Sequence, residues 1–345
     1  MVSWCGTRFW RLYDLIKEWD LLRAIACLSI VTLHTTTWMT FHNEFYAEHT
    51  ALHFIRILLC FATPTFIVLS IIILAHKYPN QLPPNFWSKR IRFLLVPYMA
   101  WAIIYAGIAE TIYRKDLFFI TVLQNFFRGD FVGWFVIVIL QLYALYALLK
   151  KYQLADVVVL PLAICISLVH HALIQLPYPF FMTHQTQFRL LLTGWLGYFA
   201  IAYLAGKHYK KLAAALLRYR WWTLVTALLS AMLVFINMKL GHTGIHSRRL
   251  DLIPFVCSMS ALILAWGQKL PYFKIVRVLS RYAFMIYLIH WQVLWFGSGF
   301  IMRFGLSFKV TIVIIVTLTV ALCIAIAWTI ARLPFGQYIV GAIKK

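Results

Sequence analysis

Long apolar segments recur along almost the entire length of this 345-residue chain. Runs long enough to span a bilayer lie at residues 20–41, 51–76, 91–113, 132–150, 156–174, 188–206, 220–239, 252–268, 280–302 and 309–331. The hydrocarbon core offers the backbone no hydrogen-bond partners, so a segment that crosses it must be a helix or belong to a closed barrel. Because the period-two alternation of barrel strands is absent, the sequence predicts an all-α polytopic membrane protein with ten transmembrane helices.

The composition leaves no room for a separate soluble domain. Charged residues make up 12% of the chain and hydrophobic residues 63%, whereas a water-soluble domain carries about twice that share of charge. A single transmembrane domain is therefore expected over residues 1–345. Residues 1–19 are too polar for a cleavable signal, so we expect them to lie as an aromatic, basic segment at the inner membrane interface.

The basic residues are unevenly divided between the loops. With the N-terminus placed in the cytoplasm, 21 of the 32 Lys and Arg residues fall on the inner side and 10 on the outer side, while Arg23 lies within the first helix. This bias follows the positive-inside rule and predicts that both termini are cytoplasmic in a multi-pass plasma-membrane protein. The net charge of +22 is then explained by orientation and by anionic lipid headgroups, so nucleic acid is not an expected partner.

Motifs of soluble enzymes and of metal sites are absent. The six cysteines are scattered and include no C-x-x-C pair, so neither a disulfide framework nor a metal site is expected. The sequence also lacks a G-x-S-x-G elbow, a Gly-rich phosphate loop and an H-E-x-x-H motif. Any chemistry must therefore come from the few polar groups inside the helices.

Two such groups, Arg23 and His34, lie in the first apolar segment. Eleven helical steps amount to three turns plus roughly 20°, so both side chains share one helix face about 16 Å apart. Ionisable groups at membrane depth are costly and usually mark a functional path. His34 is therefore a candidate to move a proton or to carry an acyl group, with a purely structural buried histidine as the alternative.

A second histidine is predicted at the same depth. His290 follows Arg281 by nine residues on a helix that also starts at the inner side, which places it about 14 Å deep. Two imidazoles at matched depth could share one site with His34. The alternative is a packing role for His290 beside Tyr287.

Three cations and one carboxylate complete the candidate residues. Lys89, Arg90 and Arg92 precede the third helix, where they could bind the phosphates of an acyl-CoA or a nucleotide, or simply anchor the chain at the membrane. Glu110 lies in the outer third of that helix. It could accept a proton from a hydroxyl or orient an imidazole, or it could pair with Arg114 one turn later.

The outer loops are rich in aromatic and polar side chains, notably in the segments 38–46 and 178–187. Aromatic faces beside hydrogen-bonding groups suit a sugar ring, which carries apolar C–H patches and hydroxyls. A Trp/Tyr belt at the membrane interface would account for the same residues.

Four stretches, in order, resemble the acyltransferase-3 family of integral-membrane O-acyltransferases. They are LLRAIACLSIVTLHTTTW, with its Arg, ten residues and His, then FATPTFIVLSIIIL, SKRIRFLLVPY and LSRYAFMIYLIH. GWFVIVILQLYAL is similar to a Trp-Phe helix of that family. Two positions depart from the pattern, because Ile71 replaces a Gly and Val132 replaces a more polar residue.

The resemblance implies transfer of an acyl group, usually acetyl from acetyl-CoA, to a hydroxyl of a cell-envelope polysaccharide or lipid-linked sugar. It makes His34 the catalytic or acyl-carrying residue and Arg23 its partner. Arg90 and Arg92 become donor-binding cations, and His290 matches a family position. No metal is implied.

Two other functions remain open at this point. A transporter of polysaccharide or lipid-linked sugar would use the same polar groups, although the absence of repeats and of Gly/Pro-broken helices weighs against it. A non-catalytic scaffold would explain neither histidine. Membrane lipids and the glycan acceptor are the expected partners, and both a homo-oligomer and a glycan-synthesis machinery stay open.

Overall fold

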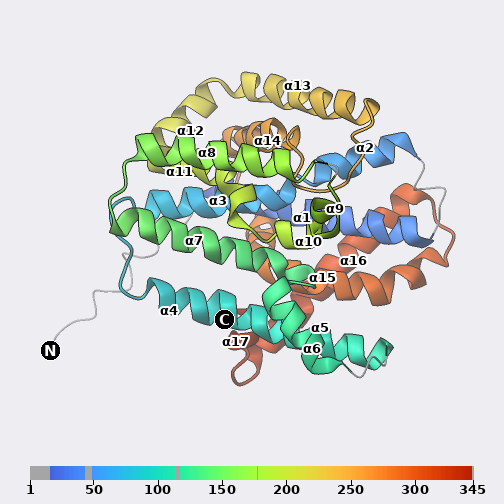
Figure 1. Ribbon diagram of the computed structural model, residues 1–345. Helices are drawn as coiled ribbons and strands as arrows, with labels where there is room; N and C mark the ends of the chain where they lie inside the picture. The colour runs from blue at the N-terminus through green and yellow to red at the C-terminus, as the bar shows by residue number, and fades with distance from the viewer. Residues whose placement is uncertain (1–15, 43–48, 114–116, 177, 344–345) are drawn as a thin grey trace.

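The computed structural model describes residues 16–42, 49–113, 117–176 and 178–343, and every regular element in these ranges is helical (Figure 1). The α-helices are α1 (Lys17–His42), α2 (Thr50–Leu59), α3 (Ala62–Lys77), α4 (Phe86–Arg90), α5 (Val96–Tyr113), α6 (Phe118–Leu123), α7 (Phe135–Lys151), α8 (Asp156–Leu173), α9 (Pro179–Thr183), α10 (Gln185–Phe188), α11 (Leu196–Lys207), α12 (Tyr209–Arg218), α13 (Arg220–Lys239), α14 (Leu252–Gly267), α15 (Lys274–Met302), α16 (Phe308–Arg332) and α17 (Gln337–Val340). Shorter stretches are π-helical over Ile91–Leu95 and Gln124–Arg128 and 3₁₀-helical over Val132–Trp134 and Leu192–Trp195. Of the predicted interfacial segment 1–19, residues 1–15 lie outside the described residues, and Lys17 already belongs to α1.

The all-α membrane architecture is confirmed, but two predicted spans are too short. Among the described residues, 8 helices are long and apolar enough to cross a membrane. The segment 188–206 yields only the 12 residues of α11, and 252–268 yields the 16 residues of α14. Helices of these lengths reach about 18 and 24 Å, short of a 30 Å hydrocarbon core.

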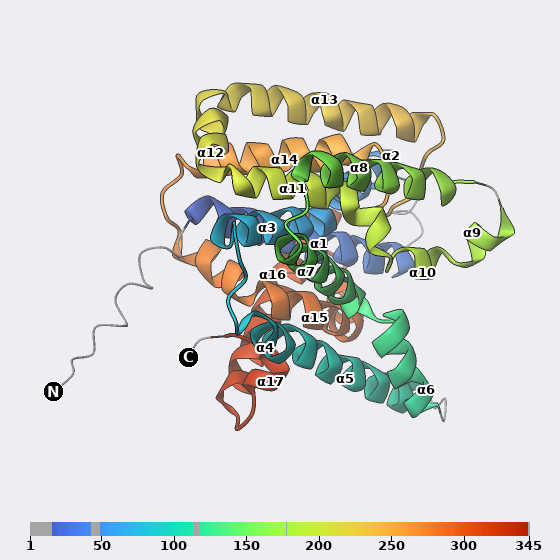
Figure 2. The ribbon, with the colours of Figure 1, turned by 60° about the vertical axis from the view of Figure 1, so that its left-hand side comes forward.

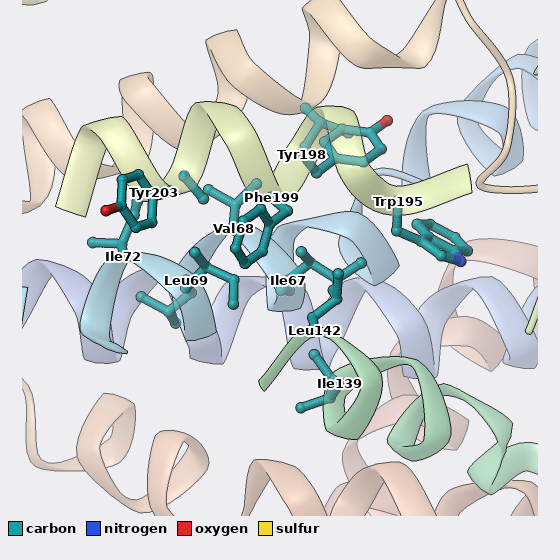
Figure 3. Packing of buried hydrophobic residues seen from close by; sticks show 14 of the residues in the cluster. Ile67, Val68, Leu69, Ile72, Ile139, Leu142, Trp195, Tyr198, Phe199 and Tyr203 are labelled. Carbon is teal, nitrogen blue, oxygen red and sulfur yellow. The ribbon is translucent and has the colours of Figure 1, made fainter. Parts of the chain in front are cut away.

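The core explains how a short helix is accommodated. α11 buries most of its side chains, and Figure 3 shows Phe199 beside Val68 and Leu69 of α3, and Tyr203 beside Ile72, with Leu142 of α7 below them. At Gly206 the two helices approach so closely that an added Cβ would lie 2.5 Å from the Ile72 carbonyl oxygen. The neighbours of α11 are therefore largely protein, so its length need not match the bilayer.

The outer faces of the bundle are apolar. Val157 of α8, Leu228 of α13 and Val313 of α16 are among many large hydrophobic side chains that remain exposed. A surface of this kind is unstable in water and suits contact with lipid chains.

Charged residues mark several helix ends. α7 ends at Lys150 and Lys151, and α8 begins at Asp156, so each charge complements the helix dipole. Arg220 and Lys239 bound α13 at the positions that the sequence predicted. Placing these charges at the water interface fixes where the apolar helices start and stop.

α1 and α15 run parallel and in register at the centre of the bundle. Arg23 contacts Ser280, which is 257 residues later, and Trp38 contacts Trp295 with the same offset. Both helices therefore begin at the end of the molecule that also carries α4, α12 and α17, whereas α6, α9 and α10 lie at the opposite end (Figure 2).

One long helix is interrupted. The stretch Thr50–Lys77 contains a turn at Cys60 and Phe61 between α2 and α3, and Pro161 lies inside α8. The turn between α2 and α3 contains neither Gly nor Pro, and α8 continues through Pro161, so neither feature is a Gly/Pro-broken helix.

Candidate active site

The structure brings His34 and His290 together. Their ring centroids are 5.2 Å apart with the planes tilted by 32°. His290 is fully buried between the helices, while His34 is half-buried and lines a cavity. The shared register of α1 and α15 creates this contact, because both histidines lie at matching positions of two parallel helices.

The proton on the His290 ring can be placed from its hydrogen bond. Nδ1 lies 2.9 Å from the Ile286 carbonyl oxygen, and because a carbonyl can only accept, Nδ1 must donate. Nε2 then carries the lone pair, and it is buried without a partner among the described residues. An unpartnered buried acceptor costs about 1–3 kcal/mol, so this atom is suited to a ligand or a transferred proton.

Three tryptophans form one wall beside His34. Trp291 packs edge-on against the His34 ring at 5.1 Å, and Trp38 lies 5.3 Å from both Trp291 and Trp295. The Trp38 indole N–H is buried and unpartnered within the described part of the chain. Trp291 and Trp295 line the cavity and offer it apolar faces, with Trp38 packed behind them.

The cavity beside His34 has a volume of about 480 Å³, which lies within the roughly 300–1,000 Å³ typical of small-molecule sites. Its polar lining comes from helices far apart in sequence, and includes Asn125, Asp130, Thr186, Arg189 and Gln292. The Gln292 side-chain oxygen has no partner among the described residues. The cavity therefore combines aromatic walls with hydrogen-bonding groups that are not already satisfied.

A tyrosine holds the turn that closes one side of the cavity. The Tyr287 hydroxyl donates to the Val132 carbonyl and accepts the Phe135 N–H at 3.2 Å. In this turn Gly133 lies against the Phe131 ring, where an added Cβ would come within 2.3 Å of the ring. Val132, which departs from the family pattern, thus contributes its backbone to the contact with α15.

Arg23 lies towards the other end of α1. It donates to Ser280 Oγ at 2.9 Å and approaches Asp20 at 3.6 Å, while Ser280 donates in turn to Asp20. Arg23 is absent from the described residues that line the His34 cavity. The two residues therefore occupy separate levels of one helix face, about 16 Å apart.

Arg90 turns inward towards the same level. Its guanidinium lies 5.0 Å from the ring centres of both Phe86 and Tyr143, and Tyr143 is close enough to Arg23 for electrostatic interaction. The buried Arg90 Nε has no partner among the described residues. Arg23 and Arg90 thus face a common aromatic side chain.

Lys89 and Arg92 stay at the surface. Both side chains are exposed, and the Arg92 guanidinium lies over the rings of Phe93 and Tyr338 at 5.3 and 5.1 Å. The cluster predicted before the third helix is therefore divided between one inward and two outward cations.

The structure does not bring Glu110 to the histidines. Its carboxylate accepts the backbone N–H of Leu117 at 3.3 Å, and it is not among the described residues that line the cavity. No contact of the described residues joins Glu110 to the histidine pair, and its catalytic role stays a prediction. Arg114, its alternative partner, lies outside the described residues.

Arg56 was not predicted as a site residue, because from the sequence it is one of the 10 Lys and Arg residues assigned to the outer side. The Arg56 guanidinium donates to Thr37 Oγ1 at 3.2 Å and lies within electrostatic reach of His34. A cation two turns inside an apolar segment is the signal that would have identified it.

Comparison with known proteins identifies the family of the chain. The acyltransferase-3 profile, described as an acyltransferase domain, matches residues 16–331. A Bacillus subtilis protein named as the membrane-bound acyltransferase YfiQ is 31% identical over 347 residues, with 95% of each chain covered.

Staphylococcal relatives carry a different name. Proteins named as poly-beta-1,6-N-acetyl-D-glucosamine export proteins are 25% identical in Staphylococcus aureus, covering 93% of this chain and 94% of theirs. The Staphylococcus epidermidis protein of that name is 24% identical over 78% of each chain. No solved structure matches. Together with the profile match over nearly its whole length, these relatives show that this chain belongs to the acyltransferase-3 family of membrane acyltransferases.

Proposed function

We propose that this protein transfers an acyl group, typically acetyl, from acyl-CoA at the cytoplasmic end of the bundle to a hydroxyl of a cell-envelope polysaccharide or lipid-linked glycan. The observation that carries the proposal is the contact between His34 and His290 at the wall of a cavity with unsatisfied polar groups. Family membership supports acyl transfer, and the staphylococcal relatives support a glycan acceptor.

In this proposal, His34 takes the proton from the acceptor hydroxyl. The hydroxyl oxygen attacks the thioester carbonyl carbon, the carbon–sulfur bond breaks, and the departing CoA thiolate receives the proton from the imidazolium. Alternatively, a His34 ring nitrogen attacks the thioester carbonyl carbon, the carbon–sulfur bond breaks and CoA leaves as the thiol with the proton of the imidazole. The acceptor hydroxyl then attacks the acyl-imidazole, the carbon–nitrogen bond breaks and the hydroxyl proton returns to the imidazole. Arg56, near His34, would stabilise the negative charge on the tetrahedral carbonyl oxygen in either route.

The donor phosphates would bind at the end of the bundle that carries Arg23 and Arg90. Arg90 keeps an unpartnered Nε beside Tyr143, and guanidinium groups match phosphate oxygens well. The exposed Lys89 and Arg92 would attract the anion to the surface. The thioester sits on a long flexible arm of CoA, which suits the separation of about 16 Å between Arg23 and His34.

The decisive experiment measures acyl transfer by purified protein in lipid nanodiscs. Acetyl-CoA and a lipid-linked oligosaccharide would be supplied, and both CoA release and acylated glycan would be quantified. We expect His34→Ala to reduce transfer at least a hundredfold, the usual scale for losing a general base. His208→Ala, which changes an exposed histidine outside the cavity, provides the matched control. Normal transfer by a folded His34→Ala protein would refute the proposal.

Export of a glycan is the second candidate, favoured by the names of the staphylococcal relatives and by the interruption between α2 and α3. It predicts movement of glycan across proteoliposome membranes without acyl-CoA. Such flux, unchanged in His34→Ala, would favour export over acyl transfer.

A further inference from the structure

Arg189 and Arg248 lie near each other at the end of the bundle that carries α10. Arg189 follows α10 directly and lines the His34 cavity. Arg248 lies in the loop between α13 and α14 and lines a second cavity of about 620 Å³. Burial, and then the nearby Arg189 guanidinium, lower the pKa of Arg248 to about 10. Gln185, one helical turn before Arg189, accepts a hydrogen bond from Arg248, so the two arginines flank the same short helix.

The two cavities are neighbours across α10. Thr186 lines the His34 cavity, and the preceding residue, Gln185, lines the second one. Gln185 also accepts a hydrogen bond from Arg248 Nη2 at 2.9 Å. A ligand that extends from one cavity into the other would therefore pass both arginines.

Neither arginine forms an ion pair with a described carboxylate, although Asp130 acts electrostatically on Arg189. Arg189 donates from Nη2 to the Gly129 carbonyl at 2.9 Å and lies over the Trp134 ring at 5.0 Å, leaving Nε unpartnered. Arg248 Nη1 is likewise buried without a partner among the described residues. The carboxylate nearest Arg189 in the cavity lining, Asp130, is paired with Arg128 at 3.4 Å.

The adjacent residue, Arg249, is an arginine of the same loop whose charge and hydrogen-bond donors have partners. Arg249 is buried, forms an ion pair with Asp251 and donates to the carbonyls of His242 and Gly244. Arg248 has no comparable set of partners. Partly buried like charges with free donors are costly unless an anion binds between them.

We propose that Arg189 and Arg248 form a binding site for an oxyanion, either a phosphate or a carboxylate, carried by the acceptor glycan. This inference rests on the proposed function for the identity of the ligand as acceptor. With the acidic group held between the arginines, the sugar bearing the reactive hydroxyl would occupy the His34 cavity. The rest of the glycan would extend past Gln175 and Asn237, whose amides line the second cavity.

Binding of an anion tests the site without any acyl transfer. Inorganic diphosphate and glucuronate would each be titrated into the purified full-length protein by calorimetry, against sodium chloride of equal ionic strength. We expect saturable binding of at least one of them, weakened about 10- to 100-fold in Arg248→Gln and Arg189→Gln, as expected for losing hydrogen bonds to a charged group. Which of the two binds more tightly distinguishes a phosphate-bearing from a carboxylate-bearing acceptor.

Arg303→Gln removes the same charge from an exposed position at the end of α15 and should bind the anions as the unaltered protein does. Arg248→Lys keeps the charge but loses the two-pronged geometry, so an intermediate affinity is expected. Thermal unfolding would be measured for each variant, and if Arg248→Gln fails to fold, Arg248→Lys carries the comparison. Unchanged anion binding in all folded Arg189 and Arg248 variants would overturn the site.

Kinetics separates this inference from the proposed function. With acidic acceptors, Arg248→Gln should raise KM about 10- to 100-fold and leave kcat less affected, whereas neutral acceptors should respond little. If the unaltered protein and Arg248→Gln both transferred acyl groups with equal KM values for acidic and neutral acceptors, the anion site would be overturned and the function left intact. Arginine-dependent anion binding without any acyl transfer would refute the function and leave the site intact.

Discussion

The hydroxyl of Tyr287 ties α15 to the turn that borders the His34 cavity, so its removal tests how far that turn depends on one contact. Tyr287→Phe deletes a hydrogen bond to the Val132 carbonyl and another from the Phe135 N–H. Each neutral hydrogen bond contributes about 1 kcal/mol, so the variant should lose about 2 kcal/mol of unfolding free energy. The ring remains, and no cavity is created.

The same change should also lower the rate of acyl transfer. The turn carries Val132 and Trp134, which line the cavity, and a misplacement of about 1 Å at a reacting centre can cost up to a hundredfold. We therefore expect a fall of a few degrees in Tm together with at least a tenfold fall in kcat/KM. Tryptophan fluorescence during heating and CoA release would measure the two effects on the same preparation.

Tyr282→Phe is the matched control for this prediction. Tyr282 lies on the same helix and is also buried, but its hydroxyl makes no hydrogen bond to a described residue. Its loss should change stability by less than about 0.5 kcal/mol and leave transfer unchanged. The reasoning fails if Tyr287→Phe and Tyr282→Phe give the same Tm and the same kcat/KM.

Four further substitutions, one of them a control, test the packing of the bundle through thermal unfolding of purified variants. Gly206→Ala should destabilise by about 1–3 kcal/mol because its Cβ overlaps α3, whereas Gly297→Ala, with nothing within 4 Å, should gain up to about 1 kcal/mol of helix propensity; equal Tm values would contradict this. Asp251→Asn should cost about 3–5 kcal/mol because it leaves Arg249 buried without its counter-charge, and an unchanged Tm would rule that out. Tyr198→Phe should be at least as stable as the unaltered protein, since the Tyr198 hydroxyl is buried without a partner among the described residues, and a lower Tm would show that it is hydrogen-bonded after all.

Local signals predicted most of the helices. Arg220 and Lys239 flank an apolar run of spanning length, and the helix between them has those residues as its ends. The prediction of a full membrane span at 188–206 was wrong because hydropathy does not reveal what surrounds a helix. α11 packs against α3 and other helices, so only 12 residues are needed where a lipid-facing helix would need about 20.

The histidine pair could be predicted from the sequence because the depth of a residue in the membrane can be counted from a charged helix end. His34 and His290 lie similar numbers of residues beyond Arg23 and Arg281, and the parallel helices place them side by side. The surroundings of the pair could not be counted in this way. Arg56 and Arg189 come from other segments, and although the depth of Arg56 in an apolar segment is a sequence signal, only tertiary packing shows that both lie near the pair.

The pairing of α1 with α15 has a consequence for how the molecule is made. The first helix enters the membrane with His34 already on its face, but the helix that completes the pair begins only at Lys274. Until the ribosome has synthesised most of the chain, the face of α1 that carries Arg23 and His34 has no α15 to pack against. Assembly of the histidine pair is therefore a late event in biogenesis, and a nonsense mutation before α15 removes His290 and leaves His34 without this neighbour.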